Sequence, residues 1–408
     1  MALDICIFED EHFSRLYPLT LTRPVFDLRC GISLLREKVA RRFPGSRSHF
    51  FCRDYLAEVV RESAPGVLVN KPPSDACLFI NGRFIFADKL PTLGSQEMVW
   101  KCSGEVAGAQ LAGTRSAALA QQKDGVLRSS LFDNLPVQEI AGTFIHYPWD
   151  LVHHNPRQIK DDFSFFDRGG QISGKIYPNV TLLEEKNIYI AAGARIKPGA
   201  VLDAEDGPIY IDEGATIMAN ASLQGPIFVG PRSTIKMGAK IYEGTSIGEV
   251  CKVGGEVEET IIHSYSNKQH DGFIGHSYFG QWVNIGADSN NSDLKNNYGN
   301  VRVAINGEMV DTGLMFVGLI MGDHSKSGIN TMFNTGTVVG VMSNVFGSGY
   351  PDKFIPSFSW GGIESTETYD LEKALEVGRR VMARRKITLS PAQEKMLRRV
   401  FEMTAKER

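Results

Sequence analysis

A six-residue period dominates the middle of the chain, where a branched aliphatic residue recurs at every sixth position. The positions are Ile211, Ile217, Leu223, Val229, Ile235, Ile241, Ile247 and Val253. This period differs from the alternation of a β-strand and from the 3.6-residue repeat of an α-helix. It is typical of a hexapeptide β-helix, in which each aliphatic side chain points inward and three sides close one coil. One coil cannot bury its own apolar sides, so several coils must stack.

The same period extends beyond this segment in both directions. Upstream it includes Ile172, Ile176, Val180, Ile190, Ile196 and Leu202. The step from Leu202 to Ile211 is three residues too long, which predicts an insertion within residues 203–207. Downstream the period resumes at Ile274, Phe279 and Ile285, and again at Met321, Ser327, Phe333, Val339 and Val345. A long polar excursion over residues 288–311 separates these two runs, and long loops in compact repeats tend to be functional.

Length and composition indicate a two-domain protein with an unremarkable surface. At about 100 to 200 residues per domain, 408 residues predict two domains and a tail. Lys and Arg number 44 and Asp and Glu 47, a net charge of −3, which predicts neither a nucleic-acid partner nor a membrane partner. The six cysteines include no Cys-x-x-Cys pair, as expected for reduced thiols. No signal peptide or membrane span is recognisable, so we expect a cytoplasmic protein.

Four regions follow from the order of these patterns. Short apolar runs alternating with an amphipathic helix at residues 33–42 predict a small α/β domain. The expected strands lie at residues 2–8, 48–52, 76–80 and 98–102. We therefore predict an α/β domain over residues 1–150, a linker over 151–170 with a helix at 151–160, a β-helix over 171–362 and a helical tail over 363–408. The tail should contain two helices that are separated near residues 387–390, because Ser390-Pro391 is a favourable helix start.

The segment 14–24, Ser-Arg-Leu-Tyr-Pro-Leu-Thr-Leu-Thr-Arg-Pro, resembles part of the sugar-1-phosphate nucleotidyltransferase signature. In that family the signature is Gly-x-Gly-Thr-Arg-Leu followed by Pro-Leu-Thr. Its glycine amides bind the nucleotide phosphates, and its arginine stabilises charge at the α-phosphorus. The resemblance implies that Arg15 takes the place of this arginine. Arg23 and Arg29 are further candidates for the nucleotide-binding domain.

The same segment departs from the family pattern at several positions. Glu11 and Phe13 occupy the two glycine positions, and Val25 replaces the lysine that usually follows Arg-Pro. The usual Gly-Asp with the metal-binding aspartate is replaced by Asn-Gly-Arg at 81–83. Two interpretations stay open: an active domain that uses Mg²⁺ and UTP or another nucleoside triphosphate, or a packing domain with surface arginines.

A second and closer resemblance begins in the β-helix. His270, Asn284-Ile-Gly-Ala287 and Asn297-Tyr298 follow one another on the hexapeptide pattern. This order resembles the acetyltransferase half of the bifunctional enzyme family that acetylates glucosamine 1-phosphate and then uridylylates it. The resemblance covers roughly residues 170 to 360. It implies a left-handed parallel β-helix, acetyl-CoA as the acetyl donor, and a homotrimer whose sites lie between the β-helices of neighbouring subunits.

The chemistry that this resemblance implies fits the residue types. An amine that attacks a thioester must lose a proton, and an imidazole with a pKa of about 6.5 can accept it. By the motif match that base is His270. The other candidates are Asn284, Asn297 and Tyr298 for the amino sugar, Ala287 and Thr335 for acetyl-CoA, and Lys240, Lys252 and Lys268 for the sugar phosphate.

Two alternatives belong to other classes of function. His276 lies six residues after His270, and histidines from neighbouring coils, with His263 or His324 as a third ligand, would build a zinc hydratase site. The asparagine-rich loop argues against zinc, because metal-bound imidazoles usually contact carboxylates. The other alternative is a non-catalytic scaffold that binds a sugar nucleotide through the first domain.

Overall fold

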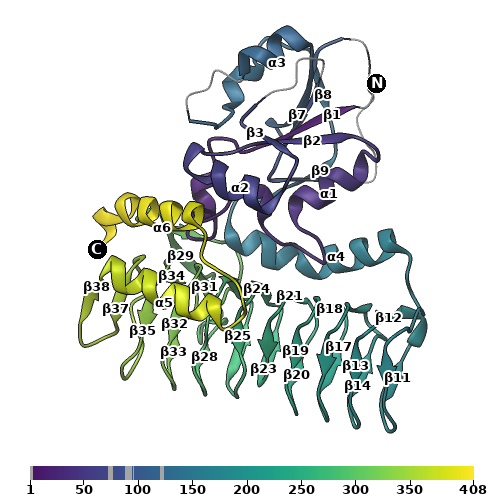
Figure 1. Ribbon diagram of the computed structural model, residues 1–408, viewed down its shortest axis with the longest axis vertical. Coiled ribbons are helices and arrows are strands. Elements are labelled where there is room, and N and C mark those ends of the chain that lie inside the picture. Colours follow the sequence, from purple (N-terminus) through teal and green to yellow (C-terminus); the bar gives the residue numbers. More distant parts are fainter. Residues whose placement is uncertain (1–2, 72–76, 88–93, 95, 120–123) are drawn as a thin grey trace.

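The computed structural model describes residues 3–71, 77–87, 94, 96–119 and 124–408. An α/β domain lies against one side of a long coil of short strands, and two C-terminal helices lie against both (Figure 1). Helix α4, Pro148–Phe166, runs between the domain and the coil. No helix in the described part of the chain is both long enough and apolar enough to cross a membrane.

The N-terminal domain contains a seven-stranded sheet with the order β3-β2-β1-β4-β7-β6-β8. The first four strands are parallel, and β7 runs antiparallel to β4. The strands are β1 Asp4–Phe8, β2 Arg47–Phe51, β3 Leu68–Val69, β4 Cys77–Asn81, β6 Met98–Cys102, β7 Glu105–Leu111 and β8 Val137–Glu139, and β5 Phe84–Phe86 pairs with β9 Gly142–Phe144. The helices are α1 Leu35–Arg42, α2 Ala57–Ser63 and α3 Gly113–Leu119. The predicted α/β class of this domain is confirmed.

The coil is a three-sided parallel β-helix, as the six-residue period predicts. The first sheet contains β10 Lys175–Ile176, β13 Arg195–Ile196, β16 Thr216–Ile217, β19 Thr234–Ile235, β22 Lys252–Val253 and β25 Asn267–Lys268. The second contains β11 Thr181–Leu183, β14 Val201–Asp203, β17 Ser222–Gln224, β20 Lys240–Ile241, β23 Glu256–Glu258 and β26 Phe273–Gly275. The third contains β12 Ile188–Ile190, β15 Ile209–Ile211, β18 Ile227–Val229, β21 Thr245–Glu249, β24 Ile261–Ser264, β27 Tyr278–Gln281, β31 Ile320–Met321, β34 Val338–Val339 and β36 Phe354–Ile355.

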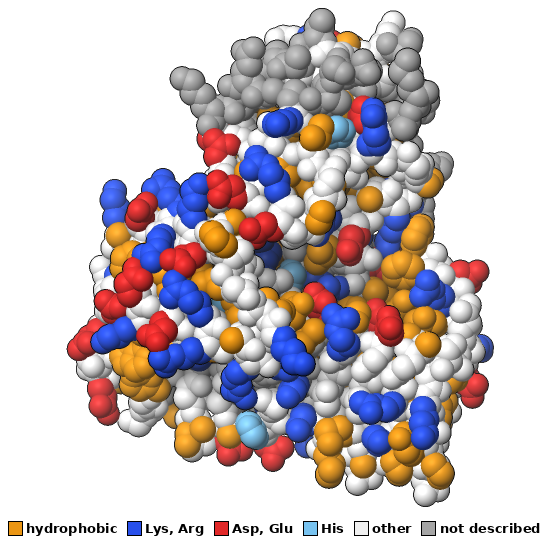
Figure 2. Space-filling model, viewed as in Figure 1, with side chains coloured by type: hydrophobic (Ala, Val, Ile, Leu, Met, Phe, Trp, Pro, Cys, Tyr) orange, Lys and Arg blue, Asp and Glu red, His pale blue; other side chains and the backbone are white. Residues whose placement is uncertain are grey.

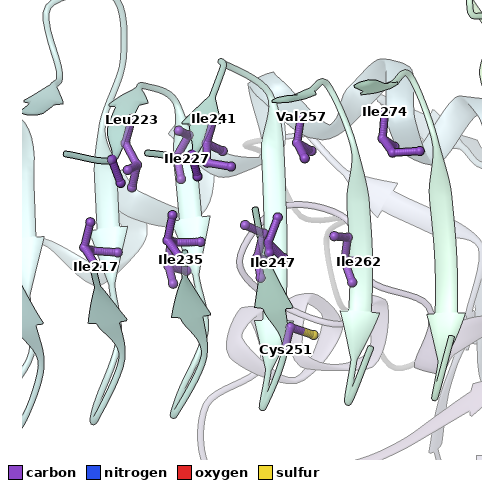
Figure 3. Packing of buried hydrophobic residues seen from close by; sticks show 14 of the residues in the cluster. Ile217, Leu223, Ile227, Ile235, Ile241, Ile247, Cys251, Val257, Ile262 and Ile274 are labelled. Atoms are coloured by element: carbon purple, nitrogen blue, oxygen red, sulfur yellow. The ribbon is translucent and has the colours of Figure 1, made fainter. Parts of the chain in front are cut away.

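The inward side chains of the three sheets form one continuous hydrophobic core (Figure 3). Each fully buried aliphatic side chain contributes about 1.5–3 kcal/mol, so the column is the main source of stability of the coil. The predicted insertion is confirmed, since Ile190 pairs with Ile211 across a longer coil than the one that joins Ile211 to Val229. The next irregularity is a shortened coil, in which Ile247 pairs with Ile262. This shortening explains why the six-residue period is lost after Val253.

The polar excursion forms a hairpin that contacts the N-terminal domain. Its strands, β29 Arg302–Ile305 and β30 Glu308–Asp311, pair antiparallel. Val301, Val303 and Ile305 belong to the same hydrophobic cluster as Leu16 and Val25. Strand β28 Asn290–Asn291, before the hairpin, pairs with β33 Met332–Phe333, after it. The other strands after the hairpin are β32 Lys326–Ser327, β35 Asn344–Val345, β37 Ser359–Gly361 and β38 Thr366–Thr368.

The two predicted C-terminal helices are confirmed as α5, Leu371–Ala383, and α6, Pro391–Met403. Ser390 caps α6, and its Oγ accepts a hydrogen bond from the Gln393 amide. Side chains of α5 and α6 share one hydrophobic cluster with α2 and with the end of the coil. These helices therefore join the end of the chain to both parts of the molecule.

Candidate active site

Three charged residues stack at the corner between the second and third sheets of the coil. Glu259, His276 and Asp293 are seventeen residues apart, and seventeen residues is also the length of the coil that pairs Glu258 with Gly275. Equal spacing therefore stacks the three side chains on successive coils. The sequence analysis considered His276 only as a zinc ligand, although this spacing was visible in the sequence.

The His276 imidazole lies between the two carboxylates. Its Nδ1 is 2.8 Å from Asp293 Oδ2, and its Nε2 is 3.3 Å from Glu259 Oε2. The Phe316 ring stacks on the imidazole at 5.0 Å between centroids. Burial lowers the pKa of His276, but the hydrogen bonds that its ring donates to Asp293 and Glu259 outweigh burial and raise the pKa to about 9. At neutral pH the ring is therefore an imidazolium that donates to both carboxylates.

Three predicted residues belong to the same corner. Asn297 and Tyr298 are exposed on the loop that leads from Asp293 into the hairpin. Thr335 is buried, and its Oγ1 donates to Ser292 Oγ at 3.0 Å. This corner thus combines an imidazole, carboxylates and amide side chains, which are groups that can bind a sugar and transfer a proton.

Other predicted residues lie at the corner between the first and second sheets. The exposed His270 lies between β25 and β26. Ala287 lies one coil further on, beside His270, because the backbone N–H of Asp288 donates to the carbonyl oxygen of Asp271. Lys268 occupies an inward position in register with Val253, and its Nζ donates to the carbonyls of residues 270 and 271. Burial lowers the pKa of Lys268 to about 8. Lys268 therefore stabilises the turn at residues 270–271 from inside the coil.

The remaining predicted coil residues are scattered over the outer surface. Lys240 is exposed and pairs with Glu256 at 3.1 Å. Lys252 is partly buried, and burial together with the charge of Arg385 lowers its pKa. Asn284 lies on the first sheet, where its Oδ1 accepts a 3.4 Å bond from Asn267. Within one chain, the predicted residues are thus divided between two corners, the first sheet and the second sheet.

The predicted arginines of the N-terminal domain differ in their surroundings. Arg15 is partly buried in the turn Phe13–Leu16. Arg23 is buried and pairs with Asp323 of the coil at 2.5 Å. The Arg29 amide donates to the Tyr278 hydroxyl at 3.0 Å, and its guanidinium lies over the Phe228 ring. Arg23 and Arg29 therefore contact the coil.

Two ion pairs occupy the carboxyl end of strand β1, where open α/β sheets commonly bind ligands. Glu9 accepts from Arg53 Nε at 3.0 Å and Nη2 at 2.9 Å. Asp10 accepts from Arg83 Nε at 2.9 Å and from Asn81 at 2.8 Å. Acidic side chains at this edge repel phosphate, and Glu9 and Asp10 are already bound to guanidinium groups. The residues present at this edge therefore do not fit a nucleotide-bound Mg²⁺ ion.

The histidines proposed for a zinc site contact other groups. His263 Nε2 lies 2.8 Å from the Asp27 carbonyl oxygen. The His324 ring is buried and stacks on Trp282 at 6.1 Å. Among the described residues, no group of three or more His, Cys, Asp or Glu side chains has the geometry to hold a metal ion.

Comparisons with known proteins found similarity over parts of the chain. Residues 5–171 match the family model described as sugar nucleotidyl transferase. A bifunctional sugar-1-phosphate nucleotidylyltransferase/acetyltransferase of Sulfurisphaera tokodaii is 28% identical over 199 residues, which are 49% of this chain and 43% of that protein. The bifunctional protein GlmU of Methanococcus aeolicus is 29% identical over 226 residues, 55% of this chain and 44% of that protein.

The chain is thus similar, over about half of its length, to a bifunctional sugar-1-phosphate nucleotidylyltransferase/acetyltransferase and to a bifunctional protein GlmU. The chain spans less than half of the length of these two relatives. A solved structure, a UDP-N-acetylglucosamine acyltransferase, matches 57% of this chain and 89% of that chain at 15% identity, with a TM-score of 0.27.

Proposed function

We propose that the coil transfers the acetyl group of acetyl-CoA to the amine of an amino-sugar 1-phosphate, such as glucosamine 1-phosphate, and that His276 is the general base. The observation that supports this most is the imidazole between Glu259 and Asp293. A carboxylate beside an imidazole fixes its orientation and stabilises its charged form after proton transfer. The names of the relatives, which include an acetyltransferase, support the reaction class.

The raised pKa of His276 sets the pH dependence of the proposed reaction. A base must be neutral before it accepts a proton, and a pKa of about 9 leaves little neutral imidazole at pH 7. We therefore expect kcat/KM to rise with pH up to about 9. Asp293→Asn should move this rise to lower pH, because it removes a hydrogen-bonded charge that stabilises the imidazolium.

We propose that the complete site forms between two chains of a homotrimer. The two corners of one chain hold different parts of the predicted set, with Asn297, Tyr298 and Thr335 at one and Ala287 at the other. Contact between unlike corners of neighbouring chains would combine the acceptor site with the acetyl-CoA site, and threefold closure would give equal sites. Met237 and Ile329, which are 64% and 71% exposed, lie on the corner between the first and second sheets and supply apolar surface for such contact.

The test measures release of the coenzyme A thiol from acetyl-CoA, with glucosamine 1-phosphate and galactosamine 1-phosphate offered separately. We expect His276→Ala to lower kcat/KM by about 10²–10⁴-fold. His270→Ala is the matched control, with the same substitution at an exposed coil corner. If His270→Ala abolished turnover and His276→Ala did not, the motif-based base would be correct and our assignment wrong. Absence of turnover in the wild-type protein with both sugars would contradict the proposed acceptor class.

We propose further that the N-terminal domain does not transfer a nucleotide at the end of β1. The Glu9–Arg53 and Asp10–Arg83 pairs support this view, because they place fixed carboxylates at the position expected for phosphates. The assay follows pyrophosphate release from UTP with N-acetylglucosamine 1-phosphate and Mg²⁺. Pyrophosphate release that requires the sugar phosphate would contradict the proposal.

A further inference from the structure

A second candidate site is a cavity of about 360 Å³ between the N-terminal domain, the third sheet of the coil and the C-terminal helices. Arg23, Arg29 and Arg36 line it from the N-terminal domain, and Ser264 and Gln281 line it from the coil. Figure 2 shows basic side chains and a histidine in the recess between the domain and the coil. The volume falls in the range of sites for small metabolites.

The three guanidinium groups are incompletely paired. Arg23 pairs with Asp323, and Arg36 Nη1 lies 2.9 Å from Asp27 Oδ1. Arg29 has no carboxylate partner among the described residues; its Nη1 donates to the Ile32 carbonyl. Arg23 Nη1 and Arg29 Nε are buried and have no hydrogen-bond partner in the described part of the chain. Buried donors without a partner are costly, so they are usually satisfied by a ligand, an ion or water.

The other charges around the cavity do not remove this excess of donors. The second lining carboxylate, Glu249, is already paired with Arg232 at 3.1 Å. His263 also lines the cavity, and burial, together with the positive charges of Arg23 and Arg29, lowers its pKa, so its ring is neutral. The unpaired charge in the cavity is therefore that of Arg29, beside the free Nη1 of Arg23.

Two aromatic side chains of the coil, Tyr265 and Trp282, also line the cavity. Tyr265 and Trp282 stack with their centroids 4.5 Å apart and their planes at 17°. His324 stacks on the other side of Trp282, so a sugar or base ring can stack on the pair only from the Tyr265 side. Arginine forks are well suited to phosphate, since several N–H groups point in one plane.

We propose that this cavity binds a phosphate monoester of a small ring-containing metabolite, with the phosphoryl group on Arg23, Arg29 and Arg36 and the ring on the Tyr265–Trp282 pair. Because the arginines come from one domain and the aromatic pair from the coil, the ligand joins the two parts of the molecule. A ligand that binds only the docked arrangement stabilises it. This site is separate from the His276 corner, and the proposal holds whether or not the coil transfers an acetyl group.

The experiment is isothermal titration of the full chain in chloride buffer with three probes: inorganic phosphate, glucosamine 1-phosphate and UMP. The variants are Arg29→Gln and Arg36→Gln, and the matched control is Arg195→Gln, an exposed arginine on the coil whose Nη2 donates to Thr216 Oγ1. We expect the wild type and Arg195→Gln to bind alike, and Arg29→Gln and Arg36→Gln to bind at least ten-fold more weakly. Circular dichroism of each variant checks its folding. If Arg29→Gln does not fold, Arg36→Gln on α1 decides.

The outcomes separate the possible ligands. Tighter binding of a monoester than of inorganic phosphate supports the proposal and shows which ring the Tyr265–Trp282 pair prefers. Absence of binding for all three probes, or equal binding by the wild type and the folded arginine variants, overturns it. Equal binding of all three probes to the wild type overturns the role of the Tyr265–Trp282 pair. The acetyl-transfer assay is not used, so failure here is distinct from failure of the proposed acetyltransferase.

Discussion

The replacement of Asp323 by alanine tests how strongly the two parts of the molecule are joined. Asp323 Oδ2 accepts hydrogen bonds from Thr22 Oγ1 at 2.7 Å and from Arg23 Nη2 at 2.5 Å. Its Oδ1 accepts from the Gln281 amide at 2.8 Å. The side chains of Arg23 and Asp323 are each only 7% exposed. One carboxylate therefore links the N-terminal loop to two coils of the β-helix.

The expected loss of unfolding free energy follows from the Arg23 charge, which stays buried when Asp323 is removed. Removal of one partner of a buried ion pair costs about 3–5 kcal/mol, because the other charge stays buried without compensation. Asp323→Ala leaves the Arg23 guanidinium in this state and also leaves Thr22 Oγ1 and the Gln281 amide without their acceptor. Replacement of both partners by apolar residues, Arg23→Met with Asp323→Leu, should cost much less, since no buried charge remains.

The assay is urea denaturation followed by circular dichroism, with the free energy of the first transition as the measured quantity. Asp352→Ala is the matched control, because it makes the same change at an exposed aspartate. We expect Asp323→Ala to lower the free energy by about 3–5 kcal/mol and Asp352→Ala to change it by less than about 0.5 kcal/mol. A loss below about 1 kcal/mol, or a double variant as unstable as Asp323→Ala, would refute the reasoning.

Three further predictions concern the coil, the His276 corner and α6. Ile247→Ala should lower the free energy of unfolding by about 2–5 kcal/mol, and Met309→Ala on the exposed side of the hairpin by less than about 0.5 kcal/mol, in urea denaturation; equal effects would contradict the inward column. Because folding raises the pKa of His276, the protonated ring stabilises the fold by up to about 3 kcal/mol, in full below pH about 6.5. This contribution is lost as the pH rises through about 9. His276→Gln should flatten that part of a stability–pH curve, and an unchanged slope would contradict the assigned pKa. Ser390→Ala should cost about 1 kcal/mol in thermal denaturation and Ser390→Gly only a few tenths, whereas equal losses would contradict the cap.

The coil could be predicted because its constraint is local and repeated. Each inward position must be apolar whatever packs on the outside of the coil, so a period of six residues is enough to define three sheets. The longer coil before Ile211 was also predictable, since an inserted residue between two inward positions changes their spacing. The shortened coil between Ile247 and Ile262 was harder to predict from the sequence. With residues missing from the coil, its inward positions no longer follow the six-residue period.

The outward residues of the third sheet indicate that this side of the coil is covered, which the six-residue period does not reveal. Strands β12, β15 and β18 have the sequences Ile-Tyr-Ile, Ile-Tyr-Ile and Ile-Phe-Val, so their outward residues are apolar as well. A strand that is apolar on both faces is expected to be covered on both faces. Tyr189, Tyr210 and Phe228 indeed form a cluster with side chains of α4. Outward residues can therefore predict which sheet meets the N-terminal domain.

The candidate site was predictable only where its residues keep the coil spacing. Glu259, His276 and Asp293 repeat with the length of one coil, so their contact follows from the register once that length is known. Lys268 shows the opposite case. A lysine in a hexapeptide motif looks available to a phosphate, but the register with Val253 turns it inward, where it binds backbone carbonyls.

The arginines show why a motif match cannot assign a partner. A guanidinium group binds a phosphate or a carboxylate with the same geometry, so the choice depends on which group tertiary structure brings to it. For Arg23 that group is Asp323, 300 residues further along the chain. The acidic segment 9–11 before the motif was visible in the sequence, and acidic side chains at the end of a first strand oppose phosphate binding there.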